Sequence, residues 1–439
     1  MPRILPFRAL RYSPEVVADL AAVVAPPYDV IEPDEHARLL ARDPRNVVRL
    51  DLPAEVPGED PDERYRRASR LLSTWRSDGT LHRDPRPSLY AYEQTFVVPG
   101  TTSSRVRRGL FARVGLEPFG PGSGIRPHER TLSGPKEDRY RLLRATNVNT
   151  SPIVGVYEDP SGAVPARLVA RAATPPLADL VDADGIRHRL WAIATTGEAD
   201  DPAAELAARI GAGPITIADG HHRYETALRY RDERRVGRVP SDDDPWESVL
   251  MLLLEPVAGP LTVLPTHRVL LGLGPDGLAA LLGDVPKVFE ATPASADALR
   301  AAFGPGADAP GGRGRFGLWT RDRGWFLDAR RDVLDAWLPP GGAALRHLDV
   351  ALLGAALERA LALDPTRIAE GGRMAYTKDA ADAIARVSTA TDGADAAFLL
   401  EPTPASAMIA VAADGDVMPQ KSTYIHPKAI TGLVINPLE

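Results

Sequence analysis

The sequence contains no cysteine and no long apolar run. The absence of cysteine excludes disulfides, thiolate zinc sites, iron-sulfur clusters and cysteine nucleophiles, so any chemistry must use oxygen and nitrogen groups. No apolar stretch reaches the roughly 20 residues that a membrane-spanning helix requires. We therefore expect a cytoplasmic protein without a membrane partner.

Positive charge is also in short supply. Lys and Arg together number 52 against 59 Asp and Glu, which gives a formal net charge of -7. Non-specific binding to DNA phosphates depends on a basic surface field, so a mainly nucleic-acid-binding role is disfavoured. Lysine itself is rare, and arginine stands wherever either residue would serve. The few lysines that remain are therefore informative: Lys136, Lys287, Lys378, Lys421 and Lys428.

The chain has 439 residues, which is more than one ordinary core holds, and its 37 glycines and 42 prolines indicate many turns. We expect an α+β fold in which helices pack on mixed β-sheets. Three parts are expected: an N-terminal α/β subdomain over 1–120, a core with the main motifs over 121–270, and a C-terminal α+β subdomain over 271–439. The last segment of the C-terminal part is expected to return to the site.

Local patterns predict the individual elements. Strands are predicted at 88–98, 107–116, 152–157, 215–218 and 432–435. Helices are predicted at 137–146, 203–210, 221–235 and 345–361. Residues 249–254 fit a buried strand or a helix segment equally well. Two stretches are expected to be irregular: a poorly patterned excursion at 159–187 and a loop-bearing insertion at 293–312.

The segment Ile217–Ala227 gives the sharpest functional signal. An apolar strand runs into Asp219, and a helix then opens with His-His-Arg. Cationic side chains are unusual at a helix start, because the free N–H groups and the helix dipole there favour anions. We predict that the helix start binds a nucleotide phosphate. In the alternative interpretation, the histidines are cap or core residues and the arginine pairs with a nearby carboxylate. The predicted phosphate-binding residues here are Gly220, His221, His222 and Arg223.

A second candidate is Glu129, which lies in the proline- and glycine-bounded segment 126–135. A zinc protease motif is excluded because Leu132 stands where the second histidine would be needed. A carboxylate among basic side chains in such a loop suits a general base that approaches a substrate hydroxyl. A solvated cluster of surface ion pairs is the alternative.

Two further segments carry weaker signals. Lys421 lies beside Ser422 and Thr423, where an ammonium and two hydroxyls can contact phosphates, although no Gly-Lys pair of a P-loop occurs in the chain. An ordered turn before the last strand is the alternative. His267 and Arg268 follow a strand-like run and form a weaker anion-site candidate, or simply a polar patch of the surface.

These motifs together resemble the bacterial and archaeal family catalogued as domain of unknown function 1015. The resemblance covers nearly the whole chain. It rests on the segments at 25–30 (Ala-Pro-Pro-Tyr-Asp-Val), 127–131 (Pro-His-Glu-Arg-Thr), 218–226 (Ala-Asp-Gly-His-His-Arg-Tyr-Glu-Thr), 265–268 (Pro-Thr-His-Arg) and 418–423 (Met-Pro-Gln-Lys-Ser-Thr).

The Asp-Gly-His-His-Arg segment also resembles the phosphate-binding element of the ParB and sulfiredoxin superfamily, which includes kinases for free L-serine. This resemblance implies that the core contains a ParB/sulfiredoxin-like unit, that Glu129 acts on the serine hydroxyl and that Asp219 arranges the site. The spacing between these two residues is larger here, with residues 159–200 as an insertion. Mg²⁺ with ATP or ADP is the implied cofactor. The expected substrate-binding residues are His128, Thr131, His267 and Arg268.

We therefore expect an ATP- or ADP-dependent kinase that phosphorylates free L-serine to O-phosphoserine. Sulfiredoxin chemistry is excluded because it needs a cysteine. The alternative is a non-catalytic, nucleotide-binding regulatory protein of ParB-like type. Partition proteins usually carry two adjacent arginines after the glycine, whereas His222 holds the first of those places here. Glu129 discriminates between the two functions, because a pure binder needs no base beside the phosphates.

Overall fold

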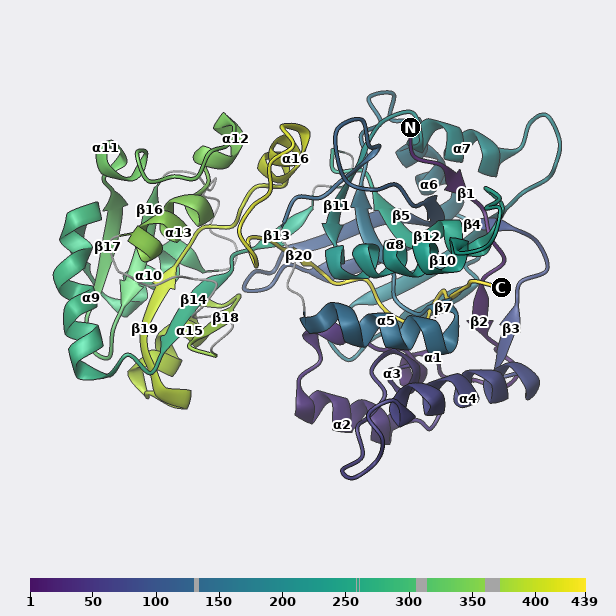
Figure 1. Cartoon of the computed structure of the whole chain (residues 1–439), viewed down its shortest axis with the longest axis horizontal. Coiled ribbons are helices and arrows are strands. Elements are labelled where there is room, and N and C mark those ends of the chain that lie inside the picture. The colour runs from purple at the N-terminus through teal and green to yellow at the C-terminus, as the bar shows by residue number, and fades with distance from the viewer. Residues whose placement is uncertain (130–133, 258, 260, 305–313, 360–371) are drawn as a thin grey trace.

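The computed structural model describes residues 1–129, 134–257, 259, 261–304, 314–359 and 372–439. These residues form two lobes that lie side by side (Figure 1). The larger lobe is built around a nine-stranded sheet and the smaller around a six-stranded sheet. The expected α+β class with mixed β-structure is confirmed. No helix of the described part is both long and apolar enough to cross a membrane.

The large sheet combines parallel and antiparallel strands. Its strands are β1 (Ile4–Leu5), β4 (Ser88–Val97), β5 (Ser104–Gly115), β6 (Ile125–Arg126), β8 (Ile153–Val156), β9 (Ala178–Val181), β10 (Arg187–Ala194), β11 (Ile215–Asp219) and β12 (Ser248–Leu254). Their order is β6-β11-β8-β12-β5-β4-β10-β9, with β1 beside β5. β6 runs parallel to β11 and β8 runs parallel to β12, while the other pairs are antiparallel. The ambiguous segment 249–254 is therefore a central strand, and its continuous apolar run matches burial on both faces.

Helices of the large lobe cover this sheet and its edges. They are α1 (Leu20–Val23), α2 (Pro33–Arg42), α3 (Val48–Asp51), α4 (Glu63–Ser77), α5 (Gly134–Thr146), α6 (Ala163–Ala172), α7 (Pro202–Ile210) and α8 (His221–Arg235). The helices predicted at 203–210 and 221–235 are confirmed, and α5 begins three residues before its predicted start. In Figure 1, α5 and α8 lie next to each other beside the sheet.

The small lobe holds an antiparallel sheet of order β15-β17-β16-β19-β14-β18. Its strands are β14 (His267–Leu271), β15 (Phe289–Ala294), β16 (Arg315–Trp319), β17 (Gly324–Ala329), β18 (Met374–Thr377) and β19 (Ala394–Leu399). Its helices include α9 (Gly274–Val288), α10 (Ala296–Phe303), α11 (Arg331–Leu334), α12 (Ala343–Arg346), α13 (Asp349–Arg359) and α15 (Ala380–Ser388).

The last part of the chain runs back from the small lobe to the large one (yellow in Figure 1). After α16 (Ala405–Ala413), β20 (Tyr424–His426) pairs with β13 (Thr262–Leu264), and β21 (Asn436–Pro437) pairs with β7 (Val148–Asn149). Strands from both sides of residue 120 belong to the large sheet. The boundary between subdomains at residue 120 therefore remains a prediction.

The long helix predicted at 345–361 is confirmed over Asp349–Arg359 but is wrong as one continuous helix. The described residues form two helices, α12 and α13, that are separated at His347 and Leu348. The apolar period continues across this break, because Leu348, Leu352 and Leu353 are all buried, so the pattern alone could not reveal it. Leu361, the last residue of the prediction, lies outside the described residues.

The strand predicted at 432–435 is also wrong. Gly432 has a left-handed φ of 93°, and a Cβ atom there would lie 2.9 Å from the Val47 side chain. A turn replaces the extended run, and isolated bridges from Thr431 to Ala25 and from Ile435 to Leu10 flank it.

The two stretches expected to be irregular contain regular structure. Residues 159–187 include α6 and the edge strand β9. An Asp159 oxygen accepts the Val164 N–H at 2.7 Å at the start of α6. In 293–312, the Ser295 hydroxyl accepts the Ala298 N–H at 3.2 Å and begins α10. Residues 305–312 lie outside the described part. The Ser295 bond is a side-chain cap of the kind that favours a helix, and the Asp159 bond satisfies a free N–H group in the first turn of α6.

Candidate active site

Gly220 forms the turn between β11 and α8. Its φ is 91°, and a Cβ atom there would lie 2.9 Å from Nε of Arg223. Glycine is suited to this position because it adopts the left-handed conformation without cost and leaves room for the guanidinium. The first turn of α8 has no acidic residue, and no side chain caps it. The free N–H groups of this helix start therefore have no capping carboxylate.

Asp219 lies at the end of β11 and pairs with two cations. Its Oδ2 accepts from Nη2 of Arg223 at 2.8 Å, and its Oδ1 accepts from Nζ of Lys428 at 2.5 Å. Burial opposes ionisation, but the two cations outweigh it and hold the pKa of Asp219 well below its usual range. Arg223 also donates to the Pro152 carbonyl. The alternative in which Arg223 pairs with a nearby carboxylate is thus the arrangement found.

His128 and His221 are buried and neutral. Burial lowers the pKa of His128 to about 4 and that of His221 well below its usual value. Nδ1 of His128 contacts the Ile217 carbonyl, so this nitrogen carries the proton and donates. The backbone N–H of His128 donates to Nε2 of His221 at 3.2 Å. The helix start is therefore less cationic than the sequence indicated. His128 also connects the segment that carries Glu129 to β11 and to α8.

His222 is half-buried beside these two histidines. Burial, and then the nearby Lys136 ammonium, lower the pKa of its imidazole. All three imidazole rings are therefore neutral, and the positive charge at the start of α8 comes from Arg223.

Glu129 lies against the returning C-terminal segment. It forms an isolated parallel bridge with Met418, and its carboxylate accepts the Lys421 N–H at 2.9 Å and the Ser422 N–H at 3.3 Å. Burial raises the pKa of Glu129 to about 7, although both N–H groups and the Lys421 charge act in the opposite direction. Nε2 of His128 lies 3.9 Å from a carboxylate oxygen. The Glu129 carboxyl group therefore gains or loses its proton near neutral pH.

The residues of the returning segment have different environments. The Ser422 hydroxyl is buried and donates to the Pro419 carbonyl at 2.5 Å, as in an ordered turn. The Thr423 hydroxyl lies 3.0 Å from Nε2 of His128. Lys421 exposes its side chain and has a left-handed φ of 54°, which is uncommon for a residue with a Cβ atom. Only Lys421 therefore offers an accessible cation from this segment.

Sequence reasoning left Lys428, Tyr424 and Lys378 out of the site. Besides its bond to Asp219, the Lys428 ammonium lies 4.6 Å from the centre of the Tyr424 ring. The ammonium of Lys378, which follows β18 of the small lobe, lies 4.0 Å from the same ring centre. Both contacts are in the range of a cation–π interaction. The rarity of lysine in this chain was the available signal for both basic residues.

The remaining predicted residues are placed differently. Arg268 is buried, and the Glu129 charge acts on its pKa, so the two residues lie in one neighbourhood. His267 is fully buried in the small lobe, where its Nδ1 accepts the Leu400 N–H at 3.1 Å and burial lowers its pKa to about 3. His267 is therefore a neutral core residue of the second sheet. Thr131 lies outside the described residues.

A Mg²⁺ site made by the protein does not fit these residues. Among the described residues, no three His, Asp or Glu side chains form a group that could hold a metal ion. Both oxygens of Asp219 accept from cationic side chains, and both oxygens of Glu129 accept backbone N–H bonds. Mg²⁺ is often held mainly by substrate phosphates and water, so the ion would have to arrive with a nucleotide.

The fold and the site define an α+β protein of two lobes with a buried, charge-paired polar cluster where the returning chain meets the large sheet. The chain belongs to the family described as "Protein of unknown function (DUF1015)", whose model matches residues 4–351. No curated protein sequence matches it.

Several solved structures show a weak likeness. A free serine kinase in complex with AMP has a TM-score of 0.37 and 12% identity, over 75% of this chain and 90% of that one. SbnI with a C-terminal truncation, from Staphylococcus aureus, has a TM-score of 0.36 and 13% identity, over 75% and 87%. A conserved hypothetical protein from Pyrococcus furiosus has a TM-score of 0.35 and 12% identity, over 69% and 87%. Likeness at this level is no basis for a function, which must come from the residues themselves.

Proposed function

We propose that this protein is an ATP- or ADP-dependent small-molecule kinase that phosphorylates free L-serine to O-phosphoserine. In this proposal the large lobe contains a ParB/sulfiredoxin-like phosphate-binding core over residues 121–270, between the N-terminal part (1–120) and the C-terminal part (271–439). The acceptor identity rests on the resemblance of the Asp-Gly-His-His-Arg segment to serine kinases.

The observation that carries the proposal is the position of Glu129. Its carboxylate lies 3.9 Å from Nε2 of His128, and the His128 backbone N–H donates to His221 at the start of α8, 93 positions further along the chain. A pKa of about 7 lets Glu129 accept a proton at neutral pH and release it again. A carboxyl group with these properties suits a general base better than a surface ion pair.

Residues of the site can carry out each part of the phosphoryl transfer. The serine hydroxyl attacks the terminal phosphorus of the nucleotide, so a new O–P bond forms, the P–O bond to the leaving nucleotide breaks, and the hydroxyl proton passes to Glu129. The N–H groups at the start of α8 bind the phosphates, and Lys421 and Lys378 add positive charge. Asp219 keeps Arg223 and Lys428 in place. Mg²⁺ accompanies the nucleotide phosphates.

The test is to incubate the full chain with ATP or ADP, Mg²⁺ and a panel of amino acids and small alcohols, and to record phosphorus NMR spectra. A new phosphomonoester with serine is expected from the wild type and none from Glu129→Gln, with nucleotide affinity unchanged within about threefold, which is less than 1 kcal/mol. Tight nucleotide binding without an ester for any acceptor would refute the kinase function.

A non-catalytic, nucleotide-binding regulatory protein is the second candidate. It is favoured by one observation: both Glu129 oxygens accept backbone N–H bonds from the returning segment, which is also what a purely structural carboxylate does. In that case Glu129→Gln would lower stability and nucleotide affinity together, whereas the kinase proposal expects a selective loss of turnover.

A further inference from the structure

A polar pocket is bordered by Arg223 and Thr226 of α8. It is lined by residues of α3, α5, α8, β12 and the β7–β8 region, and the space open to the centres of water-sized molecules is about 50 Å³. Apolar side chains such as Leu142 and Val249 form part of its wall, while Asp51, Arg223 and Thr226 supply polar groups. Arg223 and Thr226 belong to the motif at 218–226, whereas the other lining residues belong to none of the motifs assigned to phosphate binding.

Three buried polar atoms of this pocket have no hydrogen-bond partner among the described residues. They are Oδ2 of Asp51, Nε of Arg223 and Oγ1 of Thr226. Asp51 is 2% exposed and Thr226 is 4% exposed. An unsatisfied buried polar atom destabilises a protein, and native structures contain few of them. Three around one pocket indicate that the pocket is built for a ligand.

The other polar atoms of the Asp51 carboxylate and of the Arg223 guanidinium are engaged, which fixes the positions of these two side chains. The Thr150 hydroxyl donates to Oδ1 of Asp51 at 2.5 Å. The terminal nitrogens of Arg223 donate to Asp219 and to the Pro152 carbonyl. The unpaired atoms are therefore held in place by bonds that a ligand would not need to break.

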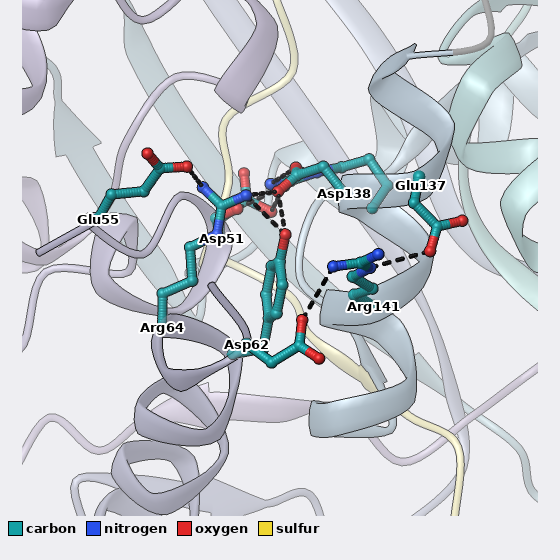
Figure 2. A network of polar contacts seen from close by, with 9 residues as sticks. Asp51, Glu55, Asp62, Arg64, Glu137, Asp138 and Arg141 are labelled. Atoms are coloured by element: carbon teal, nitrogen blue, oxygen red, sulfur yellow. Dashed lines mark hydrogen bonds and ion pairs between the residues drawn. The ribbon is translucent and has the colours of Figure 1, made fainter. Parts of the chain in front are cut away.

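Arg139 supplies charge to the pocket but few free donors. Its Nε donates to Asp138 at 2.7 Å, its Nη1 donates to the Asp51 carbonyl, and its guanidinium lies 4.1 Å from the centre of the Tyr28 ring. Figure 2 shows Asp51 and Asp138 within this network, which Arg64 extends to α4. These contacts support the backbone at Asp51 and thereby the position of its carboxylate.

The free groups divide into two chemically opposite ends. Arg223 and Thr226 are three residues apart on α8, so they share one face of the helix and can both donate to one carboxylate. Asp51 comes from α3 and offers only an acceptor. A ligand complementary to both ends carries a cationic amine and an anionic oxygen group, so it is a small zwitterion.

We propose that this pocket binds a free α-amino acid, with its ammonium group at Asp51 and its carboxylate between Arg223 and Thr226. The role of this ligand as the phosphate acceptor rests on the proposed function, whereas its binding does not. Arg223 connects the two sites, because its Nη2 is bonded to Asp219 while its Nε faces the amino acid. The pocket thus selects the acceptor by its amine and carboxylate, independently of its hydroxyl.

Binding is tested by isothermal titration calorimetry on the full chain without nucleotide. L-Serine is titrated first, followed by serinol, which lacks the carboxylate, and L-glycerate, which lacks the amine. We expect serine to bind and each analogue to bind at least roughly tenfold more weakly, because each leaves a buried polar atom of Asp51, or of Arg223 and Thr226, without a hydrogen-bond partner.

Thr226→Val is the decisive variant. It removes a hydroxyl that has no partner within the described structure, so the unfolding temperature should stay the same or rise, while serine affinity should fall roughly tenfold. Thr431→Val is the matched control, because Thr431 Oγ1 is also buried without a partner among the described residues but does not line the pocket. Asp51→Asn should abolish the preference for serine over L-glycerate.

The proposal is overturned if no free amino acid binds, if serinol and L-glycerate bind as well as serine, or if Thr226→Val binds serine like Thr431→Val. These outcomes differ from failure of the kinase function. Serine binding that is sensitive to Thr226→Val but yields no phosphoester refutes only the kinase function. Phosphoester formation with an unchanged KM for serine in Thr226→Val refutes only the amino-acid pocket.

Discussion

The substitution Glu129→Gln tests whether this carboxyl group is protonated in the native protein. Burial raises its pKa to about 7, compared with 4.5 for an ordinary glutamate. Between these two pH values the folded protein holds a proton that the unfolded chain releases, so stability falls as the pH rises. The favourable contribution is fully present below pH 4.5 and is lost as the pH rises through 7.

The magnitude follows from the size of the shift. Each pH unit within this window changes the free energy of unfolding by about 1.4 kcal/mol, so the full contribution is at most about 3 kcal/mol. Because 18% of the Glu129 side chain is exposed, water reduces this value. Glutamine keeps the shape and cannot ionise, but it offers one oxygen instead of two to the N–H groups of Lys421 and Ser422. That loss costs about 1 kcal/mol at every pH.

Urea unfolding of the wild type and Glu129→Gln at pH values from 5 to 8 measures this difference. We expect the variant to be less stable at pH 5 and to become equal or more stable at pH 8, because only the wild type loses stability across the range. Glu158→Gln, at an exposed position, controls for the loss of one charge. If the wild type and Glu129→Gln keep a constant difference from pH 5 to 8, the carboxyl group is not protonated in the native state and the assignment as a general base loses its physical support.

Three further variants test the cations of the site. Lys428→Met leaves the buried Asp219 with one cation, so we expect the free energy of unfolding at pH 7 to fall by about 2–4 kcal/mol. This difference from the wild type should disappear on acidification below about pH 4, as Asp219 becomes protonated. The control Lys287→Met, on the surface, should change the free energy of urea unfolding by less than about 1 kcal/mol. Lys421→Gly relieves the strain of a left-handed φ, so it should preserve or raise the unfolding temperature while it weakens nucleotide binding. Lys421→Ala keeps this strain, so it should not raise the unfolding temperature. Lys378→Met should weaken ATP or ADP binding about tenfold in calorimetry at unchanged thermal stability, and equal affinity would exclude Lys378 from the phosphate site.

Local patterns predicted most of the elements that carry the site. The strand and helix on either side of Gly220 follow from an apolar run, an Asp-Gly turn and helical spacing, all of which lie within 20 residues. The turn at Gly432 was missed for the opposite reason, because the close approach of Gly432 to Val47 lies in no window of sequence. The break between α12 and α13 was missed because the apolar period continues across it.

The protonation states in the site could not be predicted from the sequence. His221 follows Gly220 at a helix start and suggested a cation, but its ring is buried against His128 and is neutral. Asp219 was expected to arrange the site for the substrates, but two basic side chains already occupy its oxygens. Charge at a buried position depends on which groups the fold brings near it, and that information is absent from residue types alone.

Composition nevertheless contained a signal that motif spacing did not. Lys136 and Lys287 form ion pairs with Glu225 and Asp284, whereas Lys378 and Lys428 lie against the Tyr424 ring and Lys428 also pairs with Asp219. A chain that otherwise uses arginine keeps lysine where a compact ammonium fits and a planar guanidinium does not. At Lys428 the ammonium must bond one oxygen of Asp219 while it lies over an aromatic ring, and Arg223 already takes the other oxygen. A second guanidinium would compete for the same carboxylate, so Lys428 stands at a position where the geometry of the site requires a point charge.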